Sequence, residues 1–136
     1  MEAIMKIDFL CPKCRGYLRV GDNIILTAKT QLGGEGMLLL HPELGNYKFE
    51  HHPSIQFEDG EQIDFYCPIC HSKLTSKHHD DLAMVLMKDE NNQTFEVLFS
   101  RIKGEKSTYR IIGESMEIYG KDSGEYVDFL NLSLLT

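Results

Sequence analysis

Several features that would assign this chain to a familiar class of protein are missing from its sequence. None of its 136 residues is tryptophan, only four are proline, and no apolar run approaches the roughly 18 to 20 residues that cross a membrane. Residues 1–9 alternate charged and apolar side chains, without the basic start and apolar centre of a secretory signal. We therefore expect a cytoplasmic protein that is not inserted in a membrane.

The chain also has no excess of positive charge. Its 14 Lys and Arg are outnumbered by 21 Asp and Glu, which gives a net charge of -7. Both residues 1–80 and residues 81–136 are acidic on balance, at -3 and -4. Binding of phosphate-rich partners depends on positive charge, and Lys13, Arg15 and Arg19 beside the first cysteine pair are too few to supply it. We expect no nucleic acid and no membrane surface among the partners.

Short catalytic motifs are missing as well. The chain contains no G-x-S-x-G, no H-E-x-x-H and no phosphate-binding loop, and its glycine-rich residues 33–36 predict only a turn. A site assembled from distant strands would leave no motif, so an enzyme with an unrecognised site stays open. We favour a role without catalysis and name no catalytic residue.

Four cysteines carry the strongest signal in the sequence. Cys11 and Cys14 form one C-x-x-C pair, Cys67 and Cys70 form another, and no cysteine is left over. A disulfide framework would be unstable in a reducing compartment, so we expect these thiols to bind a metal or to carry out redox chemistry. Four thiolates complete the tetrahedral shell of Zn²⁺. The pattern predicts one zinc ion per chain.

The two pairs belong to an internal repeat. Residues 7–14 and 63–70 match at six of eight positions, and Leu18 and Leu74 follow at equal distances. In each copy, an alternating Ile-Asp-Phe strand leads into a Cys-Pro-x-Cys turn that can aim two sulfurs at one ion. The proline fixes one backbone angle in advance, which reduces the entropy lost on metal binding.

These residues resemble the zinc-ribbon and rubredoxin-like group of folds, in which two such turns, called zinc knuckles, face each other across one metal. The resemblance covers residues 7–18 and 63–74. The 52 residues between Cys14 and Cys67 exceed the spacing of a compact ribbon, which is about 15 to 20. The added loop-closure cost is only about 1 kcal/mol, against about 10 to 16 kcal/mol from structural zinc. Residues 19–62 are therefore expected to form an inserted structure.

Other uses of the cysteines are less favoured. A thioredoxin-like redox pair needs a long helix after C-P-x-C, and residues 15–23 predict none. Iron accepts the same four sulfurs. The resemblance to rubredoxins, however, implies glycine directly after each knuckle, where this chain has Arg15 and His71. We therefore prefer zinc and keep iron, in a rubredoxin-like electron carrier, as the alternative.

The remaining residues predict a mainly β fold. Before a polar boundary at residues 77–81 we expect a helical turn at 42–45 and strands at 24–28, 37–40, 46–50 and 54–57. Beyond it, we expect an antiparallel meander with strands at 82–87, 95–99, 108–112 and 116–119, the first buried on both faces.

The predicted organisation has two domains. Residues 1–80 form a small zinc-ribbon-like unit with an inserted β region, and residues 81–136 form the meander. The periodicity of residues 126–135 fits a helix or a strand equally well.

The six histidines give a weaker signal than the cysteines. His71 directly follows the last cysteine, and we expect it to be solvated rather than to bond a sulfur. A second metal site can be drawn from His51, His78 and Asp80 or Asp81, but no spacing in the sequence requires one.

The predicted function follows from the closed shell of the metal. A catalytic zinc ion keeps one coordination position open for water or substrate, whereas four cysteines occupy all four positions. We therefore expect the zinc ion to stabilise the fold. We interpret the chain as a protein-interaction or adaptor module whose meander offers an edge strand or an apolar patch to a protein partner. An electron carrier and an enzyme with an unrecognised site are the alternatives.

Overall fold

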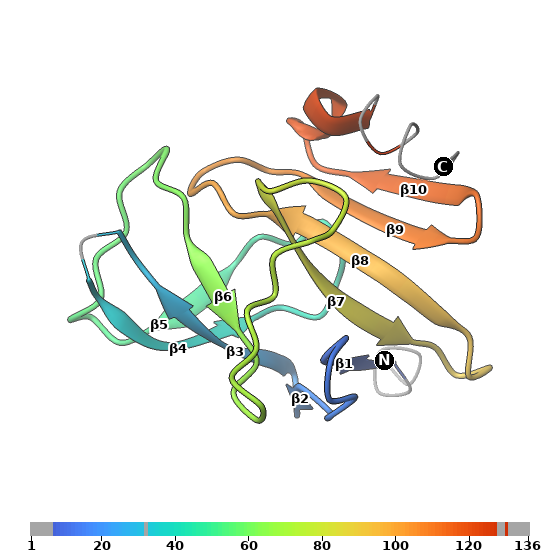
Figure 1. Cartoon of the computed structure of the whole chain (residues 1–136), viewed down its shortest axis with the longest axis horizontal. Helices are drawn as coiled ribbons and strands as arrows, with labels where there is room; N and C mark the ends of the chain where they lie inside the picture. Colours follow the sequence, from blue (N-terminus) through green and yellow to red (C-terminus); the bar gives the residue numbers. More distant parts are fainter. Residues whose placement is uncertain (1–6, 32, 128–129, 131–136) are drawn as a thin grey trace.

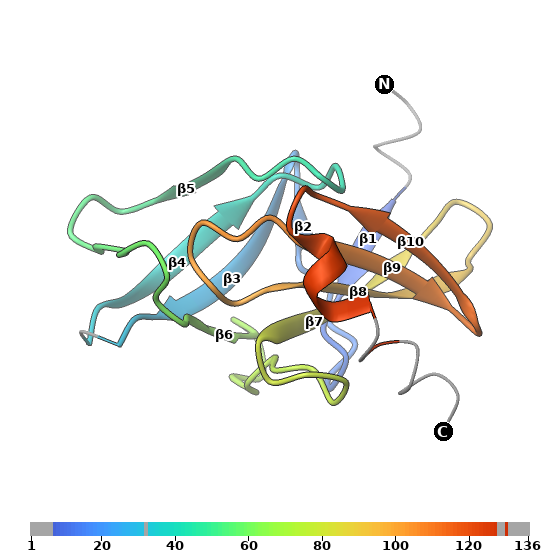
Figure 2. The same ribbon diagram turned by 90° about the horizontal axis from the view of Figure 1, so that it is seen from above.

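The computed structural model describes residues 7–31, 33–127 and 130. These residues form two antiparallel sheets of five strands each and one short 3₁₀ helix, η1 (Ser123–Tyr126) (Figures 1 and 2). The mainly β fold predicted from the sequence is confirmed. No helix in the described part of the chain is long and apolar enough to cross a membrane.

Sheet A contains the predicted meander and has the order β1-β7-β8-β9-β10. Its strands are β1 (Asp8–Leu10), β7 (Leu82–Lys88), β8 (Thr94–Ser100), β9 (Thr108–Ile112) and β10 (Ser115–Tyr119). Strand β7 is buried on both faces, as its apolar sequence predicts: Ala83 and Val85 face the core between the sheets, and Leu82 faces a second core beneath η1.

Sheet B is formed by the insertion between the knuckles together with the strand before the second knuckle. Its strands are β2 (Arg19–Val20), β3 (Asn23–Lys29), β4 (Glu35–Leu40), β5 (Phe49–His51) and β6 (Asp64–Tyr66). Along β3, Ile24, Leu26 and Ala28 alternate with more exposed residues and point into the core. The predicted inserted β region is therefore present.

Some local predictions differ from the structure. Residues 54–57 alternate in polarity but form no strand; Ile55 packs against Gly36, while Phe57 joins the aromatic rings of Phe49 and His51. Residues 42–45 form a turn rather than a helical turn. Of the ambiguous residues 126–135, Tyr126 ends η1, whereas 128–129 and 131–136 lie outside the described residues.

The two sheets share one core. It contains Phe9 of β1, Leu26 of β3, Phe65 of β6 and Val97 of β8, together with Cys11 and Cys67. Strand β1 pairs with β7 in the register Phe9↔Met87, so the first strand of the chain lies in the sheet of the C-terminal half. The division of the chain at residue 80 stays a prediction.

Candidate metal centre

The long strand β3 brings the two knuckles together. Strand β2, which follows the first knuckle, pairs with β3 in the register Arg19↔Ile24. Strand β6, which precedes the second knuckle, pairs with the same edge of β3 in the register Thr27↔Tyr66. The two short strands therefore lie end to end, and the turns attached to them meet. This pairing overcomes the separation of 52 residues in the sequence.

The sequence repeat is also a structural repeat. Three backbone hydrogen bonds of the first knuckle have counterparts of nearly equal length in the second. The donor and acceptor pairs are Cys11 N to Gly16 O (3.0 Å) and Cys67 N to Ser72 O (3.0 Å), Arg15 N to Cys11 O (2.9 Å) and His71 N to Cys67 O (2.9 Å), and Leu18 N to Phe9 O (2.7 Å) and Leu74 N to Phe65 O (2.8 Å). Each knuckle is thus a closed turn that fixes its two cysteines.

The four sulfurs lie together in the geometry that a metal ion requires. Sγ of Cys11 is 3.7 Å from Sγ of Cys70, and Sγ of Cys14 is 3.8 Å from Sγ of Cys67. All four sulfurs lie within 4.8 Å of one another. Two sulfurs that each lie about 2.3 Å from one tetrahedral zinc ion are about 3.8 Å apart. In a disulfide, the two bonded sulfurs are only about 2.05 Å apart. The cluster fits a metal ion and contains no disulfide.

Backbone amides face the sulfurs and favour their ionised form. The N–H groups of Lys13 and Cys14 lie 3.3 and 3.5 Å from Sγ of Cys11. In the second knuckle, those of Ile69 and Cys70 lie 3.3 and 3.4 Å from Sγ of Cys67. Four thiolates around a divalent ion carry a net charge of -2, which these N–H dipoles partly offset.

Arg15 and His71 adopt the left-handed conformation that normally favours glycine, with φ of 62° and 64°. In the first knuckle the amide that follows, that of Gly16, lies 3.3 Å from Sγ of Cys14. The preference for zinc over iron rested partly on the missing glycines. Because Arg15 and His71 supply the same backbone shape, their identity does not separate the two metals.

The thiols ionise at different pH because their surroundings differ. Cys11 is fully buried, and burial raises its thiol pKa to about 12 despite the facing amides. The side chain and then the backbone N–H of Ser72 lower the pKa of Cys70 to about 6; the two side-chain atoms, Sγ and Oγ, are 3.3 Å apart. Sequence reasoning missed Ser72, whose only signal is its position two residues after the last cysteine.

The affinity of the cluster for a metal should rise with pH. Metal binding requires thiolates, and the thiol of Cys11 stays protonated well above neutral pH, so binding releases its proton. One released proton gives a tenfold change per pH unit, and we expect Zn²⁺ affinity to increase at least about 100-fold from pH 6.5 to 8.5. Competition with a chelator of known proton affinity measures this slope.

Ser72→Ala serves as the matched variant for this measurement. The variant removes the hydroxyl that lowers the pKa of Cys70 but keeps the four sulfurs. Cys70 should then also release a proton when the metal binds, so metal affinity should rise more steeply with pH below neutral pH. An affinity independent of pH in the native chain would contradict the assignment of the four thiols as ligands.

The histidines do not form the second site that the sequence allowed. His51 stacks on Phe49 with ring centroids 5.5 Å apart, whereas Nε2 of His78 lies 3.0 Å from Oε1 of Glu96. Within residues 7–31, 33–127 and 130, the four cysteines are the one group of three or more His, Cys, Asp and Glu residues close enough to share a metal ion. His71 is exposed, as expected.

No family model, curated protein or solved structure matches this chain significantly. The resemblance to zinc ribbons therefore rests on the repeated knuckles alone. What the geometry establishes is a four-cysteine cluster with the spacing of a metal site.

Proposed function

We propose that this chain is a cytoplasmic zinc-binding protein in which a zinc ion held by four cysteines is structural and the β framework recognises a protein partner. The observation that carries the proposal is the placement of the four sulfurs. Cys11 follows β1 of sheet A, and Cys67 follows β6 of sheet B. An ion held by both knuckles therefore links the two sheets directly, which is a structural task, and its closed shell leaves no open position for a substrate.

Purified protein should contain about one zinc ion per chain. Four thiolates favour zinc among the divalent metals available to a cytoplasmic protein, although iron accepts the same ligands. Elemental analysis of protein that is folded by circular dichroism measures the metal content. A coloured, redox-active protein with one iron would replace the proposal by the electron carrier, and folded protein with no metal would contradict both.

Strand β10 is the surface that we assign to the partner. It forms one edge of sheet A and, among the described residues, pairs only with β9. The turn at residues 113–114 makes Ile112 and Ser115 a hydrogen-bonded pair, so the N–H groups of Met116 and Ile118 point away from β9. An extended segment of another protein can pair with these groups.

Ile118→Pro tests this edge. The substitution removes one outward N–H without touching the pairing with β9, so the fold should persist while partner binding falls at least tenfold. Ile118→Thr keeps the N–H and is the matched control. Affinity capture from cells with the native chain identifies candidate partners. The affinity of each captured partner is then measured for the native chain, for Ile118→Pro and for Ile118→Thr. Partners that bind the proline variant as well as the native chain would contradict the assignment of β10.

The net charge supports a protein partner over nucleic acid. At -7 overall, with four thiolates and one divalent ion adding a further -2, the chain offers little attraction for phosphate. We therefore place nucleic acid outside the proposed function.

A further inference from the structure

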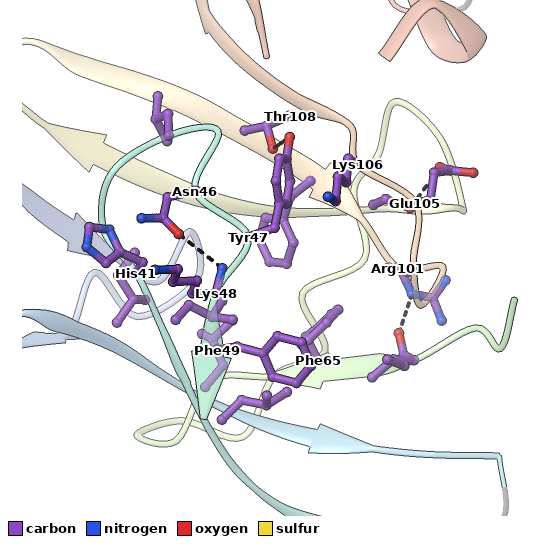
Figure 3. Close-up of a pocket in the computed structure, with 18 of the residues that line it drawn as sticks. His41, Asn46, Tyr47, Lys48, Phe49, Phe65, Arg101, Glu105, Lys106 and Thr108 are labelled. Atoms are coloured by element: carbon purple, nitrogen blue, oxygen red, sulfur yellow. Dashed lines mark hydrogen bonds between the residues drawn. The ribbon is translucent and has the colours of Figure 1, made fainter. Parts of the chain in front are cut away.

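A cavity of about 260 Å³ opens between the two sheets (Figure 3). Phe9 and Phe65, which stand two residues before Cys11 and Cys67, form part of its wall. Two segments make its rim, residues 41–49 on one side and residues 100–108 on the other. The cavity therefore lies beside the metal centre but uses none of the four sulfurs.

The inside of the cavity is apolar. Its base is the core between the sheets, where Leu26 and Val97 are buried, and the partly buried Leu40, Leu44 and Phe57 line the space itself. Phe65 packs edge-on against Phe99 with ring centroids 5.2 Å apart. The cavity is open to solvent, so part of its apolar lining lacks the contacts that a packed interior would give it. An apolar group of a ligand would restore those contacts.

The rim carries more basic than acidic side chains. Among the described residues that line the cavity are four of the 14 basic residues of the chain, Lys48, Arg101, Lys103 and Lys106, but only two of its 21 acidic residues, Glu43 and Glu105. This enrichment runs against the overall charge of -7. It points to a ligand with a negatively charged group.

Two of these cations are already paired, and two are not. Arg101 is bound to Asp64, and Nζ of Lys103 lies 3.3 Å from Oδ1 of Asp59. Lys48 and Lys106 are exposed, and no carboxylate of the described residues pairs with their ammonium groups. They come from opposite segments of the rim (Figure 3). Lys48 extends toward His41, and Tyr47 lies between it and Lys106 (Figure 3). An anionic group at the opening can therefore approach either lysine.

The acidic groups leave this opening available. Oε1 of Glu105 accepts a hydrogen bond of 2.8 Å from Ser100 Oγ, and Glu43 is exposed on the rim segment that carries Lys48. The hydroxyl of Tyr47 is held by Thr108 Oγ1 at 2.8 Å, so it is already engaged within the protein. The carboxylate of Asp122 also lies close by and accepts a hydrogen bond of 2.9 Å from the backbone N–H of Lys106. Among the lining charges whose side chains have neither an ion pair nor a hydrogen bond within the described residues, Lys48 and Lys106 outnumber Glu43.

We propose that this cavity binds a small amphipathic carboxylate, with its apolar chain against the apolar lining and its carboxylate at the rim beside Lys48 or Lys106. The volume lies just below the roughly 300 Å³ at which ligand pockets begin, so a chain of medium length suits it better than a large lipid. This ligand site does not use the outward N–H groups of β10 or the sulfurs of the metal centre, although the Tyr47 hydroxyl on its rim lies 3.3 Å from the carbonyl oxygen of Tyr119 at the end of β10.

Decanoate is the probe for this proposal, and decanol is its uncharged counterpart. Titration of the zinc-loaded protein with decanoate, followed by NMR of the backbone amides, should show saturable binding with a Kd below about 1 mM. The chemical shifts that change should be those of residues 40–49 and 100–108. Decanol should bind at least tenfold more weakly because it offers no anion to the two lysines.

The double variant Lys48→Met/Lys106→Met tests the anion directly. Methionine keeps the apolar part of each side chain, so decanoate affinity should fall at least tenfold while decanol affinity changes little. Lys29→Met, at an exposed position of β3 outside the cavity lining, is the matched control and should bind as the native chain does.

Each remaining outcome overturns the proposal. Equal affinities for decanoate and decanol, or undiminished decanoate binding by the double variant, would show an apolar cavity without anion selectivity. Saturable binding with shifts confined to other residues would place the ligand elsewhere. Absence of decanoate binding by protein that carries its metal and is folded would exclude the ligand class.

Discussion

Replacement of Cys67 by serine is expected to abolish metal binding and to unfold sheet B. The variant leaves three sulfurs, one of them the buried Cys11 with a raised thiol pKa. Structural zinc contributes about 10 to 16 kcal/mol, which is comparable to the total stability of a typical domain, about 5 to 15 kcal/mol. The loss therefore cannot be absorbed by the remaining contacts of the core between the sheets.

Sheet A should partly survive this substitution. The core on its outer face, where Tyr109 and Ile111 contact Tyr126 and Leu130, contains none of the four cysteines. We expect amide hydrogen exchange to show lost protection in β3, β4 and β6 and retained protection in β8 and β9. A chelator added to the native chain should give the same pattern.

Ser72→Ala is the control for the cysteine variant. It removes a hydrogen bond to a sulfur but keeps all four ligands, so it should cost only about 1 kcal/mol. Unfolding of Cys67→Ser in the same single transition as the native chain, at the same temperature, would show that the metal is not structural.

Replacement of Arg101 by methionine is expected to give the next largest loss of stability, about 3 kcal/mol. The guanidinium is buried and joins separate parts of the chain. It bonds the carboxylate of Asp64 and the carbonyl oxygens of Asp80 and Ile63, the last at 2.9 Å. Removal of the guanidinium leaves the carbonyl oxygens of Ile63 and Asp80 without this donor. Asp64 keeps Lys73 as a partner. We therefore expect the loss of stability to lie at the lower end of the range of about 3 to 5 kcal/mol for a broken buried pair.

Thermal unfolding should place the midpoint of Arg101→Met about 12 °C below that of the native chain. Arg110→Met is the matched control, since its partly exposed pair with Glu117, in which the side chains are 25% and 55% exposed, should contribute less than about 1 kcal/mol. Equal shifts of the two variants would show that Arg101 acts only as a surface charge and does not link the sheets.

The sequence was sufficient for features that depend on local pattern. The repeat of Ile-Asp-Phe and Cys-Pro-x-Cys identified two equivalent turns, because spacing and proline geometry act within a few residues. A continuous apolar run and alternating runs placed the strands of the meander correctly. The same alternation failed at residues 54–57, where Ile55 and Phe57 pack on sheet B without pairing as a strand.

Contacts between distant residues depended on the tertiary structure. Arg101 gave no sequence signal for its place between the sheets, because its acceptors lie 38, 21 and 37 positions away in the chain. The cavity was equally hidden, since its wall is assembled from both sheets and its rim from two separate segments.

Short-range pattern in the chain was enough to define two turns with metal-binding spacing and a mainly β fold, because turn geometry and strand periodicity are properties of short segments. Three features became visible only once the chain was folded: the turns meet along one edge of β3, β1 joins the sheet of the C-terminal half, and a cavity with a basic rim opens between the sheets. Those features depend on strand pairing and sheet packing across long sequence separations, where many arrangements satisfy the same local pattern.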